Sequence, residues 1–268
     1  MRIALGITYS GSAYEGWQSQ LSGNTVQDKL EGALGKFAAQ PVRVSCAGRT
    51  DAGVHGLMQV VHFDILLQRE TASWVRGTNA FLPRDIAVQW AQVVPSEFHS
   101  RGSAIARRYA YMVLESAVRP SIEAGRVGWV YRSLDGESMR KAAVHLLGEH
   151  DFSSFRAAQC QARSPVKTIS RIDISRRTGP DADTGSKYWR FEFEANAFLH
   201  HMIRNIMGCL MAIGQGSHPP EWLLEVLAAR TRNAAAPTFS PDGLYFLGPV
   251  YEKHFGLPDR TPAYDWLP

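Results

Sequence analysis

The chain has 268 residues, of which 45% are apolar and 20% charged, and a formal net charge of +4. This composition is ordinary for a globular protein and excludes intrinsic disorder as the default. The positive charge is compatible with a polyanionic partner without demonstrating one. The length suits one large domain or two domains of roughly 100–150 residues each.

Elements of the first hundred residues follow from two hydrophobic periods. Alternating apolar residues predict strands over 2–9, 42–46, 59–65 and 86–94. Helical spacing predicts a helix from Val26 to Phe37. Thr25 just before it and Asp28 in its first turn occupy the positions of a capping box, with Asp in place of the usual Glu or Gln. A second helix is predicted from a cap at Ser73 through Phe81. The resulting order, β-α-β-β-α-β, is that of a ferredoxin-like unit.

The second half repeats this order loosely. Strands are predicted over 109–113, 169–175, 188–195 and 243–247. Helices are predicted over 139–147, 199–210 and 220–229, the second being the most apolar and the third carrying proline in its first turn. Residues 177–187 form a predicted polar hairpin loop, and 258–268 a loose tail. We therefore expect an α+β fold.

Cysteine usage and hydropathy indicate the compartment. Cys46, Cys160 and Cys209 lie far apart without a C-x-x-C pair, so neither a disulfide framework nor a zinc knuckle is indicated. The amino-terminal residues do not resemble a signal peptide, and no apolar run approaches the ~20 residues that cross a bilayer. We expect a cytoplasmic protein without a membrane segment.

The stretch CAGRTDAGVHG, residues 46–56, places a single carboxylate, Asp51, in a glycine-rich loop after a predicted strand. Gly48 and Gly53 allow a sharp turn with Asp51 at its apex. Aspartate in such a turn commonly caps backbone amides, so residue type alone favours a structural role. A nearby Arg49 would lower the pKa of the carboxylate, and an ionised carboxylate is a competent nucleophile toward a sugar carbon. The local spacing permits catalysis without selecting it.

Two further groups combine charge with aromatic or apolar surface. Arg107, Tyr109 and Tyr111 share one face of a predicted strand. RNA sites use this mixture for phosphates and unstacked bases, but a core strand with a basic end fits equally well. On the most apolar helix, His200 and Arg204 are four residues apart beside the apolar stripe. An arginine there either reaches a carboxylate or only packs its stem.

Motifs for nucleotide phosphates and metal ions are not found. The chain contains neither G-x-G-x-x-G nor G-x-x-x-x-G-K-[ST]. His200 and His201 are adjacent, so a helix would direct them about 100° apart, and neither belongs to an H-E-x-x-H pattern. The tripeptide at 183–185 is similar to an aspartic-protease motif but lies in a polar loop, and we interpret it as a turn.

Six segments in chain order carry a more specific pattern. They are YSGSAYEGWQ (9–18), GRTDAGVHG (48–56), FHSRGSAIARRYAY (98–111), DFSSFRAAQCQARSPVKTI (151–169), NAFLHHMIRNIMG (196–208) and APTFSPDGLY (236–245). Together they resemble the tRNA pseudouridine synthase A family. This resemblance reverses the balance at Asp51 in favour of catalysis.

The resemblance implies a reaction and a set of residues. The reaction is isomerisation of uridine to pseudouridine at positions 38, 39 and 40 of the tRNA anticodon stem-loop, without cofactor or metal. Asp51 is implied as the nucleophile, Tyr109 as the catalytic residue that stacks on the uracil, and Arg204 as a charge partner of the carboxylate. Substrate contacts are implied for Arg49, Tyr109, Arg107, Arg108, His55 and Leu244, of which Arg49 is also a charge partner of Asp51 and Leu244 packs against the flipped base.

The family likeness also implies an assembly and an architecture. The expected partners are tRNA and a second copy of the chain in a homodimer. The expected fold has two ferredoxin-like (RRM-like) halves, residues 1–104 with the Asp51 loop and 105–268 with an RNA-binding strand and helix. Their antiparallel sheets are expected to join into one continuous sheet around a central basic cleft.

A single carboxylate suits this chemistry. Glycosidases use two carboxylates because one activates or replaces water. An isomerase recaptures the leaving base, so no water is required and one carboxylate suffices. Whether Asp51 attacks C1′, adds to the uracil ring or acts through elimination stays open.

Two other functions are possible alternatives to the isomerase. A catalytically silent RNA-binding module is disfavoured by intact Asp51, Tyr109 and Arg204, and a carboxylate-dependent hydrolase requires a second catalytic acid.

Overall fold

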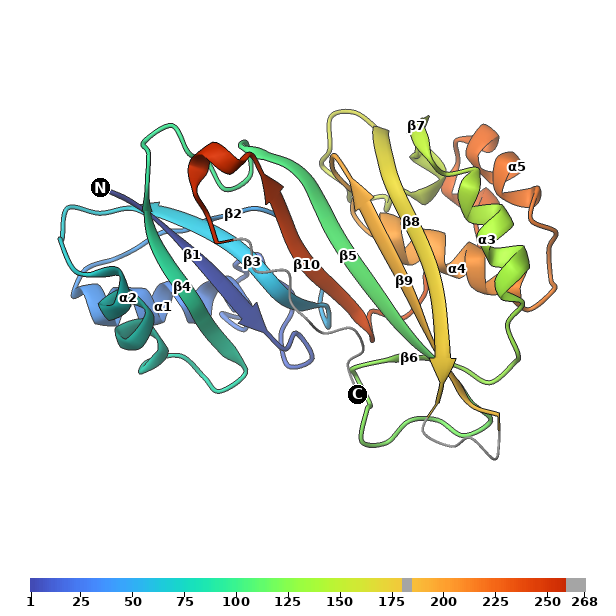
Figure 1. Cartoon of the computed structure of the whole chain (residues 1–268), viewed down its shortest axis with the longest axis horizontal. Coiled ribbons are helices and arrows are strands. Elements are labelled where there is room, and N and C mark those ends of the chain that lie inside the picture. Colours follow the sequence, from blue (N-terminus) through green and yellow to red (C-terminus); the bar gives the residue numbers. More distant parts are fainter. Residues whose placement is uncertain (180–184, 259–268) are drawn as a thin grey trace. The chain divides into compact units, whose positions relative to one another are not determined.

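The computed structural model describes residues 1–179 and 185–258. It contains both helices and strands, and most of the strands pair antiparallel (Figure 1). Contacts divide the chain into two compact units. Unit 1 comprises Met1–Arg108 and the described residues from Tyr245 onward, and unit 2 comprises Tyr109–Leu244. These features agree with the expected α+β class. The two ferredoxin-like halves with a boundary at 104/105, the continuous sheet and the basic cleft stay predictions.

Unit 1 is built on the amino-terminal elements. They are β1 (Arg2–Tyr9), α1 (Val26–Ala38), β2 (Ser45–Cys46), β3 (His55–Asp64), α2 (Thr71–Asn79), β4 (Ile86–Val94), the first residues of β5 (Ala104–Glu115) and, from Tyr245, β10 (Leu244–Tyr251). Within the unit the strand order is β4-β1-β3-β10, with β2 also paired to β3. All of these pairs are antiparallel except β3 with β10, which is parallel.

The core of unit 1 follows from the predicted alternation along β1. Ile3, Leu5, Ile7 and Tyr9 all belong to one buried cluster with Leu30 and Leu34 of α1 and Trp74 of α2. The two helices lie on this face of the sheet (Figure 1). At the start of α1, Thr25 accepts a hydrogen bond from the Asp28 N–H at 3.2 Å and its hydroxyl lies 2.6 Å from the Asp28 carboxylate. The predicted cap is therefore confirmed.

Three boundaries in unit 1 differ from expectation. The strand expected over 42–46 is confined to Ser45–Cys46, because the Val44 N–H donates to the Glu31 carboxylate at 3.0 Å rather than to a neighbouring strand. Strand β3 begins at His55 instead of residue 59. Helix α2 begins at Thr71 after the cap position Glu70, so Ser73 lies inside the helix and is not its cap.

Unit 2 contains the remaining elements. They are the later part of β5, then β6 (Gly128–Val130), α3 (Gly136–Val144), β7 (Gly148–Asp151), β8 (Val166–Thr178), β9 (Lys187–Ala195), α4 (Met202–Gly214) and α5 (Trp222–Ala229). The strand order is β5-β9-β8-β7, with β6 paired in parallel to β5. Helix α3 contacts both α4 and β8 (Figure 1). As predicted, Trp189, Phe191 and Phe193 of β9 are buried together in the core.

Helix boundaries in unit 2 also differ. Helix α4 begins at Met202, and His201 is its cap residue with a left-handed φ of 61°. The expectation that a helix separates His200 and His201 by 100° is therefore wrong, because both precede the helix. Helix α3 ends at Val144, and Gly148 opens β7 instead of closing the helix. Pro220 precedes α5 rather than lying in its first turn.

Two expected segments extend beyond the described residues. In the polar hairpin loop over 177–187, residues 180–184 lie outside the described residues, and with them the first two residues of the tripeptide at 183–185. In the tail over 258–268, residues 259–268 lie outside them as well. Among the described helices, none combines the length and the hydropathy that a bilayer crossing demands.

Candidate active site

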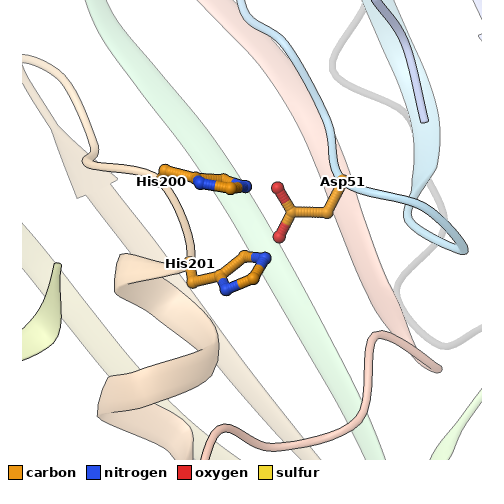
Figure 2. Close-up of side chains that lie close together, drawn as sticks. All are labelled: Asp51, His200 and His201. Carbon is orange, nitrogen blue, oxygen red and sulfur yellow. The ribbon is translucent and has the colours of Figure 1, made fainter. Parts of the chain in front are cut away.

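Asp51 lies in the loop that joins β2 to β3, with its side chain drawn in Figure 2. The side chain is partly buried. Its backbone carbonyl accepts a hydrogen bond from the Val54 N–H at 3.2 Å, which closes a tight turn around Ala52 and Gly53. Gly53 has a left-handed φ of 80°, where glycine carries no steric cost. The predicted turn is thus present at Gly53.

Residues before Asp51 are held by hydrogen bonds from two directions. The buried Gln59 side chain pairs with both polar groups of the Gly48 backbone: its amide donates to the carbonyl and its oxygen accepts from the N–H. The Trp17 N–H donates to the Thr50 carbonyl at 3.0 Å. Gly16 lies against the same loop, with φ of 95°, and a Cβ there would approach the Thr50 oxygen to 2.8 Å. The loop is therefore packed without room for a side chain at Gly16.

The Tyr9 hydroxyl also contacts this loop, at the end of β1. It lies 2.8 Å from the Thr50 hydroxyl in a buried hydrogen bond. Tyr9 is paired with Gly56 in the β1–β3 register, and a Cβ on Gly56 would lie 2.4 Å from the Tyr9 ring. Glycine at 56 thus allows the ring to cross β3 and reach Thr50.

Arg49 is exposed on the same loop. Its charge acts on the neighbouring Cys46: burial raises the pKa of that thiol to about 11, while Arg49 and Arg101 oppose the rise. The role of Arg49 as a charge partner of the carboxylate stays a prediction.

His55 is buried at the first position of β3, only 3% exposed. Its Nδ1 accepts a hydrogen bond from the Gly11 N–H at 3.2 Å, so the neutral ring carries its proton on Nε2. The ring stacks on Tyr245 of β10 with centroids 4.7 Å apart. These contacts anchor the carboxyl-terminal end of the Asp51 loop, and direct substrate contact by His55 stays a prediction.

The two adjacent arginines of β5 have different surroundings. The Arg107 guanidinium donates to backbone carbonyls of Ala104, Arg101 and Ala47, which links the start of β5 to the beginning of the Asp51 loop. Within the described residues, the Nε of Arg108 is buried without a hydrogen-bond partner. RNA contact by either arginine stays a prediction.

Tyr109 and Leu244 belong to unit 2 and are both buried, at 8% and 4% exposure. The Tyr109 ring meets Phe198 edge to face, with centroids 5.2 Å apart. Leu244 follows a turn in which Gly243 has φ of 84° and a Cβ would lie 2.2 Å from the Met112 carbonyl oxygen. Both side chains are thus buried within their unit, and their contacts with a uracil stay predictions.

Arg204 lies in the first turn of α4. His200 and His201, which Figure 2 draws, come just before this helix. Its Nε donates to the Phe239 carbonyl at 3.0 Å, and the Phe239 N–H donates back to the Arg204 carbonyl at 3.1 Å. The rings of His200 and His201 have centroids 4.0 Å apart. The guanidinium is thus oriented by a backbone carbonyl, and its pairing with Asp51 stays a prediction.

Sequence reasoning missed the residues that brace the Asp51 loop. Tyr9 and Thr50 belong to two of the six motifs, but neither they nor Gln59 are predicted to support Asp51. Their polar side chains are visible in the sequence, but only the fold shows that they are buried around this loop. Within either unit taken alone, the described residues hold no group of three His, Cys, Asp or Glu side chains close enough to share a metal ion.

Comparison with known proteins identifies the family. A family model described as tRNA pseudouridine synthase matches residues 7–101 and 142–252. Similar curated proteins named tRNA pseudouridine synthase A occur in Polaromonas naphthalenivorans, 83% identical over 268 residues, and in a second Polaromonas strain, 81% identical; both matches cover the whole of each chain. A protein of the same name from Acidovorax ebreus is 70% identical over 274 residues, also covering both chains fully. The chain belongs to the tRNA pseudouridine synthase A family, a family of isomerases.

Proposed function

We propose that this chain isomerises uridine to pseudouridine at positions 38, 39 and 40 of the tRNA anticodon stem-loop, with Asp51 as the nucleophile. Membership of the family supports the coarser activity, isomerisation of uridine in tRNA. The observation that carries the assignment of Asp51 is its place in GRTDAGVHG, on a loop held by buried hydrogen bonds on both sides of the residue.

The proposed chemistry requires one carboxylate on a fixed backbone. The bond between N1 and C1′ breaks, the uracil turns, and C5 bonds to C1′, so the atoms of the substrate are conserved in the product. Since the base is recaptured and no water enters, one carboxylate serves where glycosidases use two. Asp51 supplies it, and rigid placement lowers the barrier because the attacking oxygen is already oriented.

The target uridine must leave the stem to be reached, and this is why the proposal includes aromatic and apolar residues that contact the base. A base stacked in a stem is unreachable, so the nucleotide is flipped at a cost of a few kcal/mol, offset by stacking on an aromatic ring. Tyr109 is proposed for this stacking, with Leu244 against the other side of the base. Arg204 and Arg49 are proposed as charge partners of Asp51, and Arg107, Arg108 and His55 as further contacts to the tRNA.

The proposal includes an assembly and a location. Following the family resemblance, we place the active protein in the cytoplasm as a homodimer with tRNA across both subunits. Gel filtration with light scattering at the concentration of the assay tests the dimer. A monomer that retains full activity would contradict it.

Product analysis tests the function. Purified protein is incubated with unmodified tRNA transcripts that carry uridine at positions 38, 39 and 40, and pseudouridine is mapped at each position. We expect pseudouridine only in the anticodon stem-loop, with no free uracil and no strand cleavage. Free base would indicate the hydrolase, and tRNA binding without product the silent binding module. Transcripts with cytidine at the three positions are the control for site selection.

A further inference from the structure

We propose that Tyr9, through the hydrogen bond between its hydroxyl and that of Thr50, is a positioning residue for the Asp51 carboxylate. The inference rests on the proposed function in one respect, since it takes Asp51 as the nucleophile. All the residues that carry it lie in unit 1.

The hydrogen bond acts on the residue next to Asp51. Thr50 is 7% exposed and Tyr9 4% exposed, and their hydroxyl oxygens lie 2.8 Å apart. Gln59, fully buried, pairs with the Gly48 backbone through its side-chain amide, and the same side chain also acts on the Tyr9 hydroxyl. Tyr9 thus joins a buried network that holds the backbone one and three residues before the carboxylate.

The other side of Asp51 is restrained independently. The Val54 N–H donates to the Asp51 carbonyl, and the Val54 carbonyl packs on Gly11, where a Cβ would lie 2.0 Å from its oxygen. With both sides held, the direction of the Asp51 side chain depends on the peptide that joins it to Thr50. Removing the Tyr9 hydroxyl releases that peptide on one side only.

The Tyr9 hydroxyl is unsuited to proton transfer. Burial raises the pKa of Tyr9 well above its ordinary value, with the bonds to Thr50 and Gln59 opposing the rise. The hydroxyl therefore stays protonated over the working range of the enzyme. A positioning role predicts that its removal lowers the rate without changing the shape of the pH profile, whereas loss of a general acid or base would change that shape.

The test compares three substitutions at the bond with one matched control. Tyr9→Phe and Thr50→Val each remove one hydroxyl and keep the side-chain volume nearly unchanged, and Thr50→Ser keeps the hydroxyl. Tyr251→Phe is the control, because it also removes a partly buried tyrosine hydroxyl of unit 1, but one that donates to the Ser100 carbonyl, outside residues 48–54. Single-turnover rate, tRNA dissociation constant, pH profile and folded fraction are measured for each.

We expect Tyr9→Phe and Thr50→Val to lower the single-turnover rate about tenfold, because small displacements of reacting groups are costly. The tRNA dissociation constant should stay within about twofold, since the bond is buried. Thr50→Ser should keep the rate within about threefold. The variant that combines Tyr9→Phe with Thr50→Val should be no more than about twofold slower than the slower of the two single variants, because each substitution removes the same hydrogen bond.

Hydrogen exchange of the amides in 48–54 supplies a readout independent of the reaction. We expect Tyr9→Phe to exchange this segment about tenfold faster or more, and Tyr251→Phe to leave it unchanged. Unchanged protection in both Tyr9→Phe and Thr50→Val overturns the positioning role, as does a rate within about twofold of the parent. If Tyr9→Phe does not fold, the Thr50→Val and Thr50→Ser pair decides. A parent protein that forms no pseudouridine overturns the proposed function, while exchange still judges the positioning role.

Discussion

His62 of β3 is a buried imidazole whose surroundings favour its neutral form. It is 6% exposed, and its Nδ1 accepts a hydrogen bond from the Ser100 N–H at 3.2 Å. The His99 ring lies 4.7 Å away between centroids. Burial, followed by the charges of His99 and Arg2, lowers the pKa of His62 to about 4, with Asp64 opposing. Burial explains the direction of the shift, since it disfavours the charged ring.

Stability should therefore depend on pH through His62. The pKa is about 4 in the folded protein against 6.5 for an ordinary histidine, so the unfolded chain binds more protons between these values. The free energy of unfolding accordingly falls as the pH decreases from 6.5 toward 4. We measure the free energy of unfolding in urea at pH 4–8 for the parent and for His62→Gln. The difference between the two should shrink as the pH decreases from 6.5 toward 4. His218→Gln, which changes an exposed imidazole, is the control, and a constant difference for His62→Gln would contradict the assignment.

Single residues also mark the limit of sequence reasoning. Asp51 was identifiable because six motifs surround it, and its turn at Gly53 follows from glycine chemistry. Tyr9 is identifiable as a core residue and as the first residue of a motif, but its hydrogen bond is not, because alternation shows which face of a strand a side chain occupies and not what its hydroxyl contacts. The contact with Thr50 exists because β1 and β3 pair in a register that places Tyr9 opposite Gly56.

At the scale of elements, hydrophobic periodicity and cap residues located the strands β1 to β4 and the helices α1 and α2 of unit 1, but several ends were misplaced and the short 3₁₀ helix Lys253–Phe255 was not predicted. The ends were decided by side-chain hydrogen bonds that periodicity does not report. Strand β2 is short because Glu31 of α1 takes the Val44 N–H. In unit 2, α4 starts three residues later than its apolar stripe, because His201 adopts a left-handed backbone. The stripe continues into the preceding loop, since Leu199 is also buried.

Replacing a glycine by alanine should change the free energy of unfolding in opposite directions in the two helices of unit 1. A Cβ on Gly32 of α1 meets nothing within 4 Å, whereas one on Gly77 of α2 would lie 2.0 Å from the Phe37 ring, itself packed on Trp74. Gly32→Ala should raise the free energy of unfolding by about 0.5–1 kcal/mol through helix propensity. Gly77→Ala should lower it by about 1–3 kcal/mol through overpacking. Chemical denaturation measures both, and equal signs would refute the packing of α1 on α2.

At the scale of the whole molecule, the units are not continuous in sequence. Strand β10, from the carboxyl-terminal part of the chain, pairs with β3 at Tyr245 opposite His55 and Phe246 opposite Gly56. A periodic pattern predicts the strand but not its neighbour, since parallel pairing over such a separation has no local signal. This pairing matters for the site, because Tyr245 stacks on the His55 ring at the end of the Asp51 loop.

The net charge of +4 leads to a prediction for tRNA binding. Basic side chains that neutralise phosphates release counterions, so affinity falls linearly on a double-logarithmic plot against salt. We expect the dissociation constant of tRNA to rise by at least about tenfold between 50 and 200 mM salt, with a slope set by the number of phosphates contacted. A dissociation constant that does not change with salt would contradict a polyanion site.

The most direct test of the central claim is the single-turnover rate of Asp51→Asn on tRNA with uridine at positions 38, 39 and 40. The change removes the charge and keeps the shape of the side chain, and Asp173→Asn, an exposed aspartate on β8, is the matched control. We expect Asp51→Asn to bind tRNA within about threefold of the parent and to form pseudouridine at least about a thousandfold more slowly, a loss of roughly 4 kcal/mol of transition-state stabilisation. Pseudouridine formation by Asp51→Asn at the rate of the parent would contradict this expectation.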